Sequence, residues 1–393
     1  MIFKKITFLI VSLSQFCIAQ NVDFDKGTIL QKKYYEVIQY ESIYDKIIIS
    51  VTINSKIFRF LLDTGAPNLI SNEVMQELNS VSTKSVNISD ANNLNQSMQS
   101  VVIPKIEIGK LIFEEQIALV FDFKNHNLLS CYKIDGFIGS NLLKNSILKI
   151  DKTNQNLVIT DQFELLNVKI KPTKIKLIGS QKAPYIELNF LGKNKEKASD
   201  MVLVDTGMDG LYDMSNRAFA IFENQNIFEI KGKSEGLSSV GLFGLGKPSL
   251  QKLVLLENTF LNNKSIKNLY ADTTDDVNSR IGLKFLDYGN IIIDFKKKNF
   301  YFEANDTILL TIKEPKFALT IFDNKLIIGL VWDKNLAEKI KFGDEILSID
   351  AFNTNEMKSC EILNLKKYVK NKFFYTIVVK NKEGQISKIN IEN

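Results

Sequence analysis

The stretch Phe60-Leu61-Leu62-Asp63-Thr64-Gly65-Ala66 joins an apolar run to a carboxylate, a hydroxyl and a glycine. The apolar run is typical of a buried strand, and residues just past such a strand are held in place by the sheet. A carboxylate in an apolar setting costs several kcal/mol unless something compensates for it. Asp63 is therefore a candidate functional residue.

A second copy of this pattern occurs at Val202-Leu203-Val204-Asp205-Thr206-Gly207, and the two copies continue in register. Gly139 lies 76 positions after Asp63, and Gly282 lies 77 positions after Asp205. Residues at matching distances beyond these two glycines are Asp151 and Asn156 in the first copy, and Asp294 and Asn299 in the second. The middle of the chain is therefore interpreted as a duplication of about 120 residues per copy. We expect Asp151 and Asp294 to end strands at hairpins, a structural role.

The length of 393 residues predicts two or three domains. The duplication places the first lobe at 40–168 and the second at 172–306. From residue 312 the pattern changes to short strands and helices, which predicts a small α+β domain over 312–391. Within these parts we expect helices at 72–78 and 361–369, and a final hairpin that turns at Lys382-Glu383-Gly384.

Residues 1–19 have the pattern of a secretory signal peptide. Lys4 and Lys5 precede the apolar run 6–13, and Cys17-Ile18-Ala19 supplies small residues for cleavage near Ala19. The run is too short to span a membrane, and the bulky Phe16 disfavours lipid attachment at Cys17. We therefore expect export to the periplasm or the extracellular space.

Composition excludes several classes of protein. Apolar residues make up 45% of the chain and charged residues 24%, as in soluble globular proteins. Removal of two signal lysines changes the net charge from +5 to 5 − 2 = +3, and the Lys296-Lys297-Lys298 run is typical of a hairpin turn, so no nucleic-acid partner is expected.

Cys131 and Cys360 lie in different predicted domains, so we expect no disulfide. The only histidine is His126, which we expect to be solvated and which excludes histidine-based zinc clusters.

The duplication suggests a joint use for its two aspartates. If a pseudo-two-fold axis relates the lobes, Asp63 and Asp205 face one another and share a proton, because two like charges so close cannot both ionise. The ionised carboxylate can take a proton from water while its partner donates to a carbonyl oxygen. Gly65 and Gly207 allow a sharp turn and offer N–H groups, and the hydroxyls of Thr64 and Thr206 can bond across the lobe interface.

These motifs resemble those of bilobal, retropepsin-like aspartyl proteases of secreted bacterial proteins. Asp63-Thr64-Gly65-Ala66 is the first motif, and Phe137-Ile138-Gly139 resembles the element that supports the active-site loop. Phe342 to Asp350 resembles part of a PDZ domain. The resemblance implies a mainly β fold with two pseudo-symmetric pepsin/retropepsin-like β-barrel lobes and a PDZ-like α+β domain. It also implies a monomeric endopeptidase that takes extended peptides and needs no metal or cofactor.

The second motif departs from this family. Met208 and Asp209 follow Gly207 where a small residue is usual, and Arg280 stands before Ile281-Gly282 where an apolar residue is usual. Flap candidates are 90–96 in the first lobe and the glycine-rich 238–246 in the second. The tail has no Gly-Leu-Gly-Phe-type loop, so strand addition of a ligand beside 317–321 and packing against the body both remain open.

Two functions follow from these observations. The first is an exported aspartic endopeptidase with an Asp63/Asp205 dyad. The alternative is a non-catalytic protein that binds peptides in the protease-like cleft and on the PDZ-like tail, which the residues Met208 and Arg280 favour. A third possibility is that removal of residues 20 to about 40 activates the enzyme.

Overall fold

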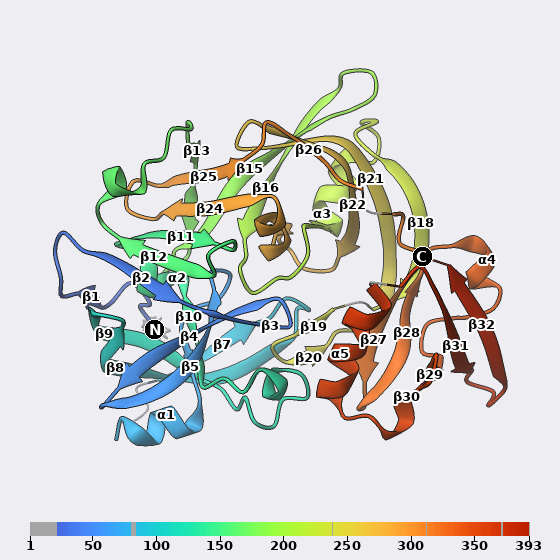
Figure 1. The fold of residues 1–393 in the computed structure, drawn as a ribbon, viewed down its shortest axis with the longest axis horizontal. Coiled ribbons are helices and arrows are strands. Elements are labelled where there is room, and N and C mark those ends of the chain that lie inside the picture. The colour runs from blue at the N-terminus through green and yellow to red at the C-terminus, as the bar shows by residue number, and fades with distance from the viewer. Residues whose placement is uncertain (1–21, 80–83, 238, 312, 371, 393) are drawn as a thin grey trace, which may run out of the picture.

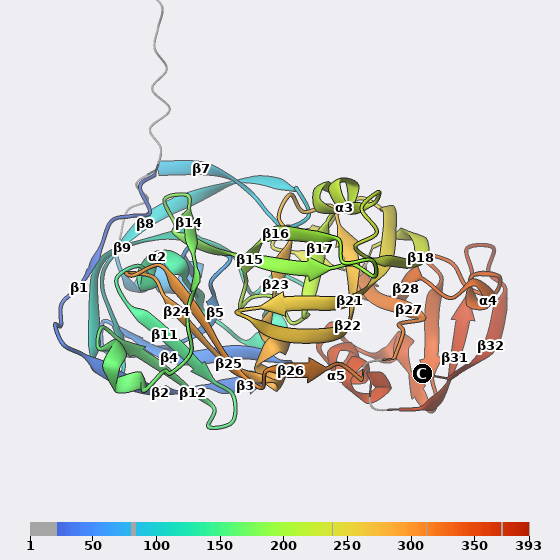
Figure 2. The same ribbon diagram turned by 90° about the horizontal axis from the view of Figure 1, so that it is seen from above.

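The computed structural model describes residues 22–79, 84–237, 239–311, 313–370 and 372–392. The chain is mainly β, with two related lobes, a sheet to which both lobes contribute strands, and a tail beside the second lobe (Figures 1 and 2). The predicted fold class, mainly β with two pseudo-symmetric lobes, is confirmed. The predicted signal peptide lies outside the described residues, and no helix among the described residues is long and apolar enough to cross a membrane.

Lobe 1 is built on a nine-stranded sheet in the order β1-β9-β6-β10-β5-β4-β8-β7, with β3 beside β4. Its strands are β1 (Thr28–Ile29), β3 (Glu41–Ile43), β4 (Lys46–Ile53), β5 (Lys56–Asp63), β6 (Leu69–Ile70), β7 (Lys84–Ser89), β8 (Asn95–Ile108), β9 (Leu111–Val120) and β10 (Gly136–Gly139). Its helices are α1 (Asn72–Glu77), the 3₁₀ turn η1 (Leu129–Tyr132) and α2 (Ser140–Leu143). The helix predicted at 72–78 is therefore present, with the Ser71 hydroxyl accepting from the Val74 N–H at its N-cap.

Lobe 2 repeats this plan with the order β14-β15-β16-β23-β17-β22-β21-β18, and β26 beside β22. Its strands are β14 (Lys176–Ile178), β15 (Ala183–Leu191), β16 (Lys197–Val204), β17 (Tyr212–Ser215), β18 (Glu229–Gly236), β21 (Ser249–Leu261), β22 (Lys264–Thr274), β23 (Arg280–Ile281) and β26 (Thr307–Leu309). A separate hairpin is formed by β19 (Val240–Gly241) and β20 (Gly244–Leu245), and the helices are α3 (Asn216–Phe222) and the 3₁₀ turn η3 (Leu283–Asp287).

A six-stranded sheet joins the lobes in the order β13-β25-β24-β11-β12-β2. Its strands are β2 (Tyr35–Gln39), β11 (Ile147–Asp151), β12 (Asn156–Thr160), β13 (Thr173–Lys174), β24 (Gly289–Asp294) and β25 (Asn299–Ala304), and the 3₁₀ turn η2 (Phe163–Leu166) follows β12. The hairpins β11–β12 and β24–β25 come from equivalent parts of the two copies and pair at the centre, where Ile147 is opposite Asp294. Asp151 and Asp294 each accept a backbone N–H of the turn that follows, as expected of strand-ending residues.

The segment proposed for removal is part of this shared sheet. β2 is an edge strand that pairs with β12, and the hydroxyls of Tyr34 and Ser146 are hydrogen-bonded at 2.8 Å. Loss of residues 20 to about 40 would therefore remove an edge strand of the body.

The tail has its own sheet and core. Its strands are β27 (Phe317–Phe322), β28 (Lys325–Val331), β29 (Glu345–Ile349), β30 (Phe352–Asn353), β31 (Phe374–Lys380) and β32 (Ile386–Glu392), and its helices are α4 (Lys334–Ala337), the 3₁₀ turn η4 (Thr354–Glu356) and α5 (Ser359–Lys370). The helix and the hairpin predicted for this part are present. Buried side chains of the strands and of α5 form a cluster separate from the large core of the lobes.

The tail is fastened to both lobes. On lobe 2, the Leu237 N–H donates to the Gly329 carbonyl at 3.0 Å, and Leu253 packs with Leu330 and Trp332. On lobe 1, Leu128 packs against the core of the tail. Packing of the tail against the body, one of the two possibilities left open by the sequence, is therefore observed.

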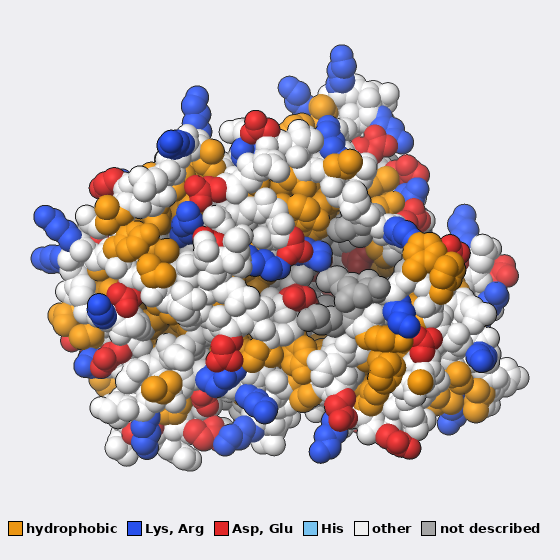
Figure 3. Space-filling view, viewed as in Figure 1, with side chains coloured by type: hydrophobic (Ala, Val, Ile, Leu, Met, Phe, Trp, Pro, Cys, Tyr) orange, Lys and Arg blue, Asp and Glu red, His pale blue; other side chains and the backbone are white. Residues whose placement is uncertain are grey.

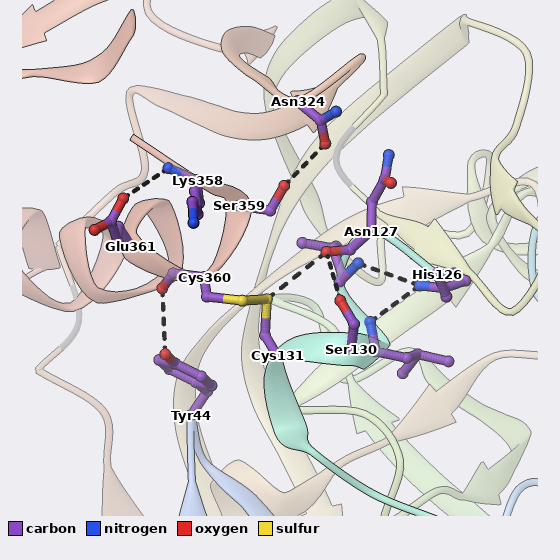
Figure 4. Close-up of a disulfide and its surroundings, with 12 residues drawn as sticks. Tyr44, His126, Asn127, Ser130, Cys131, Asn324, Lys358, Ser359, Cys360 and Glu361 are labelled. Atoms are coloured by element: carbon purple, nitrogen blue, oxygen red, sulfur yellow. Dashed lines mark hydrogen bonds between the residues drawn. A yellow bond between two sulfur atoms is a disulfide. The ribbon is translucent and has the colours of Figure 1, made fainter. Parts of the chain in front are cut away.

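The expectation that the protein has no disulfide is wrong. Cys131 in η1 and Cys360 in α5 form one, with their Cα atoms 5.2 Å apart, and the Tyr44 hydroxyl donates to the Cys360 carbonyl at 3.2 Å (Figure 4). The cysteines do lie in different domains, 229 residues apart, but the tail docks with the start of α5 against lobe 1. His126 is close by and half-buried instead of solvated, and its Nδ1 accepts the Leu128 and Leu129 N–H groups.

The surface shows no large field of one charge on the face drawn in Figure 3. There, basic and acidic side chains are interspersed over both lobes and the tail.

Candidate active site

Both aspartates stand where a strand ends between the lobes. Asp63 is the last residue of β5, whose neighbour β10 runs parallel to it with Gly139 opposite Asp63. Asp205 directly follows β16, and its N–H donates to the Ile281 carbonyl of β23 at 2.9 Å. In each lobe, the strand that leads to the closing glycine predicted from the repeat, β10 or β23, thus supports the aspartate.

Each carboxylate lies against the glycine of the opposite lobe. A Cβ placed on Gly65 would be 2.8 Å from Asp205 Cγ, and a Cβ on Gly207 would be 2.5 Å from Asp63 Oδ2. A side chain at either position would therefore collide with the opposite carboxylate. The same two glycines donate their N–H groups to Asp63 Oδ1 at 2.9 Å and to Asp205 Oδ1 at 2.8 Å. The arrangement brings the two carboxylates together around a pseudo-two-fold axis.

The threonines tie the two loops together. Thr64 Oγ1 donates to the Val204 carbonyl at 2.5 Å and accepts the Thr206 N–H at 3.1 Å. Reciprocally, Thr206 Oγ1 donates to the Leu62 carbonyl at 3.0 Å and accepts the Thr64 N–H at 2.9 Å. Both side chains are buried. Four hydrogen bonds therefore cross the lobe interface and fix the separation of the aspartates.

The environment favours one proton on the pair. Burial, followed by the charge of Asp205, raises the pKa of Asp63 to about 7, although the Gly65 N–H and the cations Lys46 and Arg280 act in the opposite direction. Asp63 is therefore protonated in mildly acidic solution, where an exposed aspartate is ionised.

Arg280 bonds directly to the second aspartate. Its Nη1 lies 3.1 Å from Asp205 Oδ2, and its Nη2 forms an ion pair with Asp276. All three side chains are largely buried. The position that matches Arg280 in lobe 1 is Phe137, two residues before the closing glycine. The sequence identified Arg280 as a departure from the family pattern but gave no sign of its partners.

Lys46, at the start of β4, is a site residue that the sequence analysis missed. Its Nζ donates to the Gly207 carbonyl and lies 3.4 Å from Asp209 Oδ1. Asp209, one of the two unusual residues after Gly207, is therefore paired with a cation from the other lobe. The only available signal was a lysine directly before the apolar run 47–49.

Met208 is buried inside the second loop. Its side chain packs against Gly210 and Gly282, and its carbonyl accepts the Leu283 N–H at 2.8 Å. The bulky residue after Gly207 thus supports the loop from within.

The two segments predicted as flaps contact one another. The Phe243 N–H donates to Asp90 Oδ2 at 2.8 Å, and Asn92 Nδ2 donates to the Gly244 carbonyl at 2.8 Å. Beside them is a cavity of about 60 Å³, lined by Asn92 and by Asp213 and Asp272 of lobe 2. Burial raises the pKa of Asp213 to about 6 and that of Asp272 to about 7.

Comparisons with known proteins found a family model and similar structures. Residues 49–142 match the family model described as "Aspartyl protease". The match covers Asp63 and the supporting glycine of lobe 1 and ends before lobe 2. The chain is also similar in structure to an aspartic proteinase from Irpex lacteus (12% identity, 69% of this chain and 97% of that chain, TM-score 0.42). A retropepsin-like aspartic protease from Rickettsia conorii is a further structural match (18% identity, 34% of this chain and 94% of that chain, TM-score 0.24). No curated protein sequence matches the chain.

The described residues contain no group of three or more histidine, cysteine, aspartate or glutamate side chains placed to hold a metal ion.

Proposed function

We propose that the protein is an exported aspartic endopeptidase in which Asp63 and Asp205 activate a water molecule against a peptide bond. The observation that carries this proposal is the reciprocal packing of each carboxylate against the glycine of the other lobe. Burying two acids face to face costs free energy, so an interface that served only to hold the lobes together would not be expected to contain them. The match of residues 49–142 to an aspartyl protease family model supports the same reaction class.

The geometry supports a water-dependent hydrolysis. One carboxylate of the pair is ionised and can accept a proton from water, and the other is protonated and can donate to the carbonyl oxygen of the substrate. The threonine bonds and the glycine N–H groups hold the acids before substrate arrives, so little reorganisation is needed during the reaction. The substrate that fits such a site is an extended peptide lying between the lobes.

Export is supported by two features. Residues 1–19 have the pattern of a signal peptide, and the Cys131–Cys360 disulfide is a bond that persists in oxidising compartments. For the tail we propose a PDZ-like unit that serves chiefly as a fixed part of the body, since it is bonded to both lobes.

The alternative is a protein that binds peptides without cleaving them. The specific observation in its favour is the Arg280–Asp205 ion pair, because it engages one oxygen of a proposed catalytic group. This alternative predicts that extended peptides bind and that no turnover occurs at any pH.

The experiment that distinguishes these two functions is incubation of an unfolded protein mixture with the protein from about pH 4 to about pH 8, with cleavage followed by mass spectrometry. We expect new termini with the wild type and none with Asp63→Asn. The matched control is Asp323→Asn, the same substitution at an exposed turn of the tail, which should cleave like the wild type. Cleavage by Asp63→Asn at the wild-type rate would refute the proposal, and binding without turnover in the wild type would favour the alternative.

A further inference from the structure

Arg280 makes the two halves of the dyad unequal. It lies on β23, parallel to β16 and antiparallel to β17, so that its neighbours across the sheet are Leu203 and Asp213. From there the guanidinium reaches Asp205 Oδ2 with Nη1 at 3.1 Å and Asp276 with Nη2. A guanidinium is charged at every pH that the protein survives, and its planar donors suit carboxylate oxygens.

The described residues of lobe 1 place no guanidinium against Asp63. Phe137 occupies the matching position and is buried, and Asp63 Oδ1 instead accepts the N–H groups of Gly65 and Ala66, at 2.9 and 3.1 Å. The cation of lobe 1 near the site is Lys46, which bonds to the Gly207 carbonyl and pairs with Asp209. Among the described residues, Arg280 is thus the cation that bonds directly to either carboxylate of the dyad.

We propose that Arg280 is a positioning residue that assigns the roles within the dyad: it fixes Asp205 as the carboxylate that accepts a proton from water, and it leaves Asp63 as the acid that donates to the substrate. This inference rests on the proposed function. The physical reason is that a fixed cation 3.1 Å from Asp205 Oδ2 stabilises negative charge on that side, so the one proton that the pair holds resides on Asp63.

Other charged or titratable groups face the pair, Asp209 among them, but among the described contacts Arg280 is the one whose side chain bonds to Asp205. Lys46 acts on both aspartates from β4, whereas Asp213 of β17 and Tyr185 of β15 act on Asp205 without a hydrogen bond to it among the described contacts. Asp276 shares the guanidinium and so holds it in place from the other side.

The reaction balances with these roles. As the water oxygen bonds to the carbonyl carbon, one water proton moves to Asp205 and the Asp63 proton moves to the carbonyl oxygen, which gives a gem-diol. When the C–N bond breaks, Asp205 gives its proton to the leaving nitrogen and Asp63 takes one back from a hydroxyl of the gem-diol. The products are a carboxylic acid and an amine, and the dyad returns to its starting state.

The test is the pH dependence of kcat/KM for Arg280→Met, Arg280→Lys and the wild type on one fluorogenic peptide. Arg280→Met lets the dyad take up a second proton at a pH where the wild type holds only one, so its acid limb should move to higher pH, by about one unit or more, with a lower maximum rate. Arg280→Lys keeps a cation at this position, so its acid limb should lie close to the pH of the wild-type acid limb. The matched control is Arg217→Met, in α3 and exposed, which should leave the profile unchanged. A wild-type profile for folded Arg280→Met would overturn the inference.

A second measurement does not depend on turnover. Double-mutant cycles of urea unfolding would compare Arg280→Met combined with Asp205→Asn and with Asp63→Asn. We expect the unfolding constants to be coupled by about tenfold or more for Arg280 with Asp205, and by clearly less for Arg280 with Asp63, which it does not contact directly. Equal coupling in the two cycles would overturn the assignment of roles even if the enzyme is active. Absence of wild-type turnover together with unequal coupling would refute the proposed function and leave the asymmetry standing.

Discussion

Replacement of Asp63 by asparagine should stabilise the protein at neutral and alkaline pH. The pKa of Asp63 rises from 3.8 to about 7 in the folded state, so the folded protein prefers the protonated acid and the unfolded chain prefers the carboxylate. At about 1.4 kcal/mol per tenfold change in acidity, this difference corresponds to about 4 kcal/mol of folding free energy. Part of it is shared with Asp205, so about 2 to 4 kcal/mol is the expected effect of the substitution.

The sign of the pH dependence follows directly. Below about pH 4 the carboxyl is protonated in both states and costs nothing, and between about pH 4 and pH 7 the unfolded chain loses the proton first, so wild-type stability falls as pH rises. Asp63→Asn has no proton to lose at this position and should lack that part of the slope.

The assay is urea unfolding followed by circular dichroism, for both proteins at about pH 4, 6 and 8. The gap between them should open with increasing pH and favour the variant. Parallel curves at all three values would refute the claim that Asp63 is held protonated by its surroundings.

Three further predictions concern the supports of the site. Thr64→Val leaves buried groups of lobe 2 without their partner and should cost about 1 to 3 kcal/mol in unfolding free energy, with Thr64→Ser close to the wild type; equal losses would show that the hydroxyl is unimportant. Replacing Cys131 and Cys360 together by serine should cost about 2 to 4 kcal/mol and speed proteolytic release of the tail, whereas an unchanged digestion pattern would mean that the noncovalent contacts suffice. Asp90→Ala removes the acceptor of the Phe243 N–H and should raise the rate of amide exchange in the hairpin β19–β20, measured by hydrogen–deuterium exchange; unchanged protection would contradict a bond between the flaps.

The sequence was most informative where the chemistry is local. Asp63 and Asp205 each follow an apolar run and precede a threonine and a glycine, so the strand, the turn and the acid are specified within seven residues. The supporting Gly139 and Gly282 could be located because a duplication preserves spacing. These signals predicted the two lobes and the crossed threonine bonds.

Contacts that form only when the lobes and the tail pack together could not be predicted from the sequence. The partner of Cys131 depends on how the tail lies against lobe 1, and 229 residues separate the two cysteines. Lys46 reaches the second loop only because the lobes face each other. For Arg280 the sequence showed an unusual residue but not its partner, because the reach of a long side chain across two strands is set by the packed fold.

The measurement that tests the central claim most directly is the affinity for a transition-state analogue. A peptide cleaved by the enzyme would be made with a hydroxyethylene group, CH(OH)–CH₂, in place of the scissile amide, and its binding compared with that of the same peptide carrying the hydroxyl-free group CH₂–CH₂ at that position. If Asp63 and Asp205 together bind the attacking water, the wild type should prefer the alcohol by about 100-fold or more and Asp63→Asn should lose most of that preference. Equal affinity of the wild type for the two peptides would contradict the account.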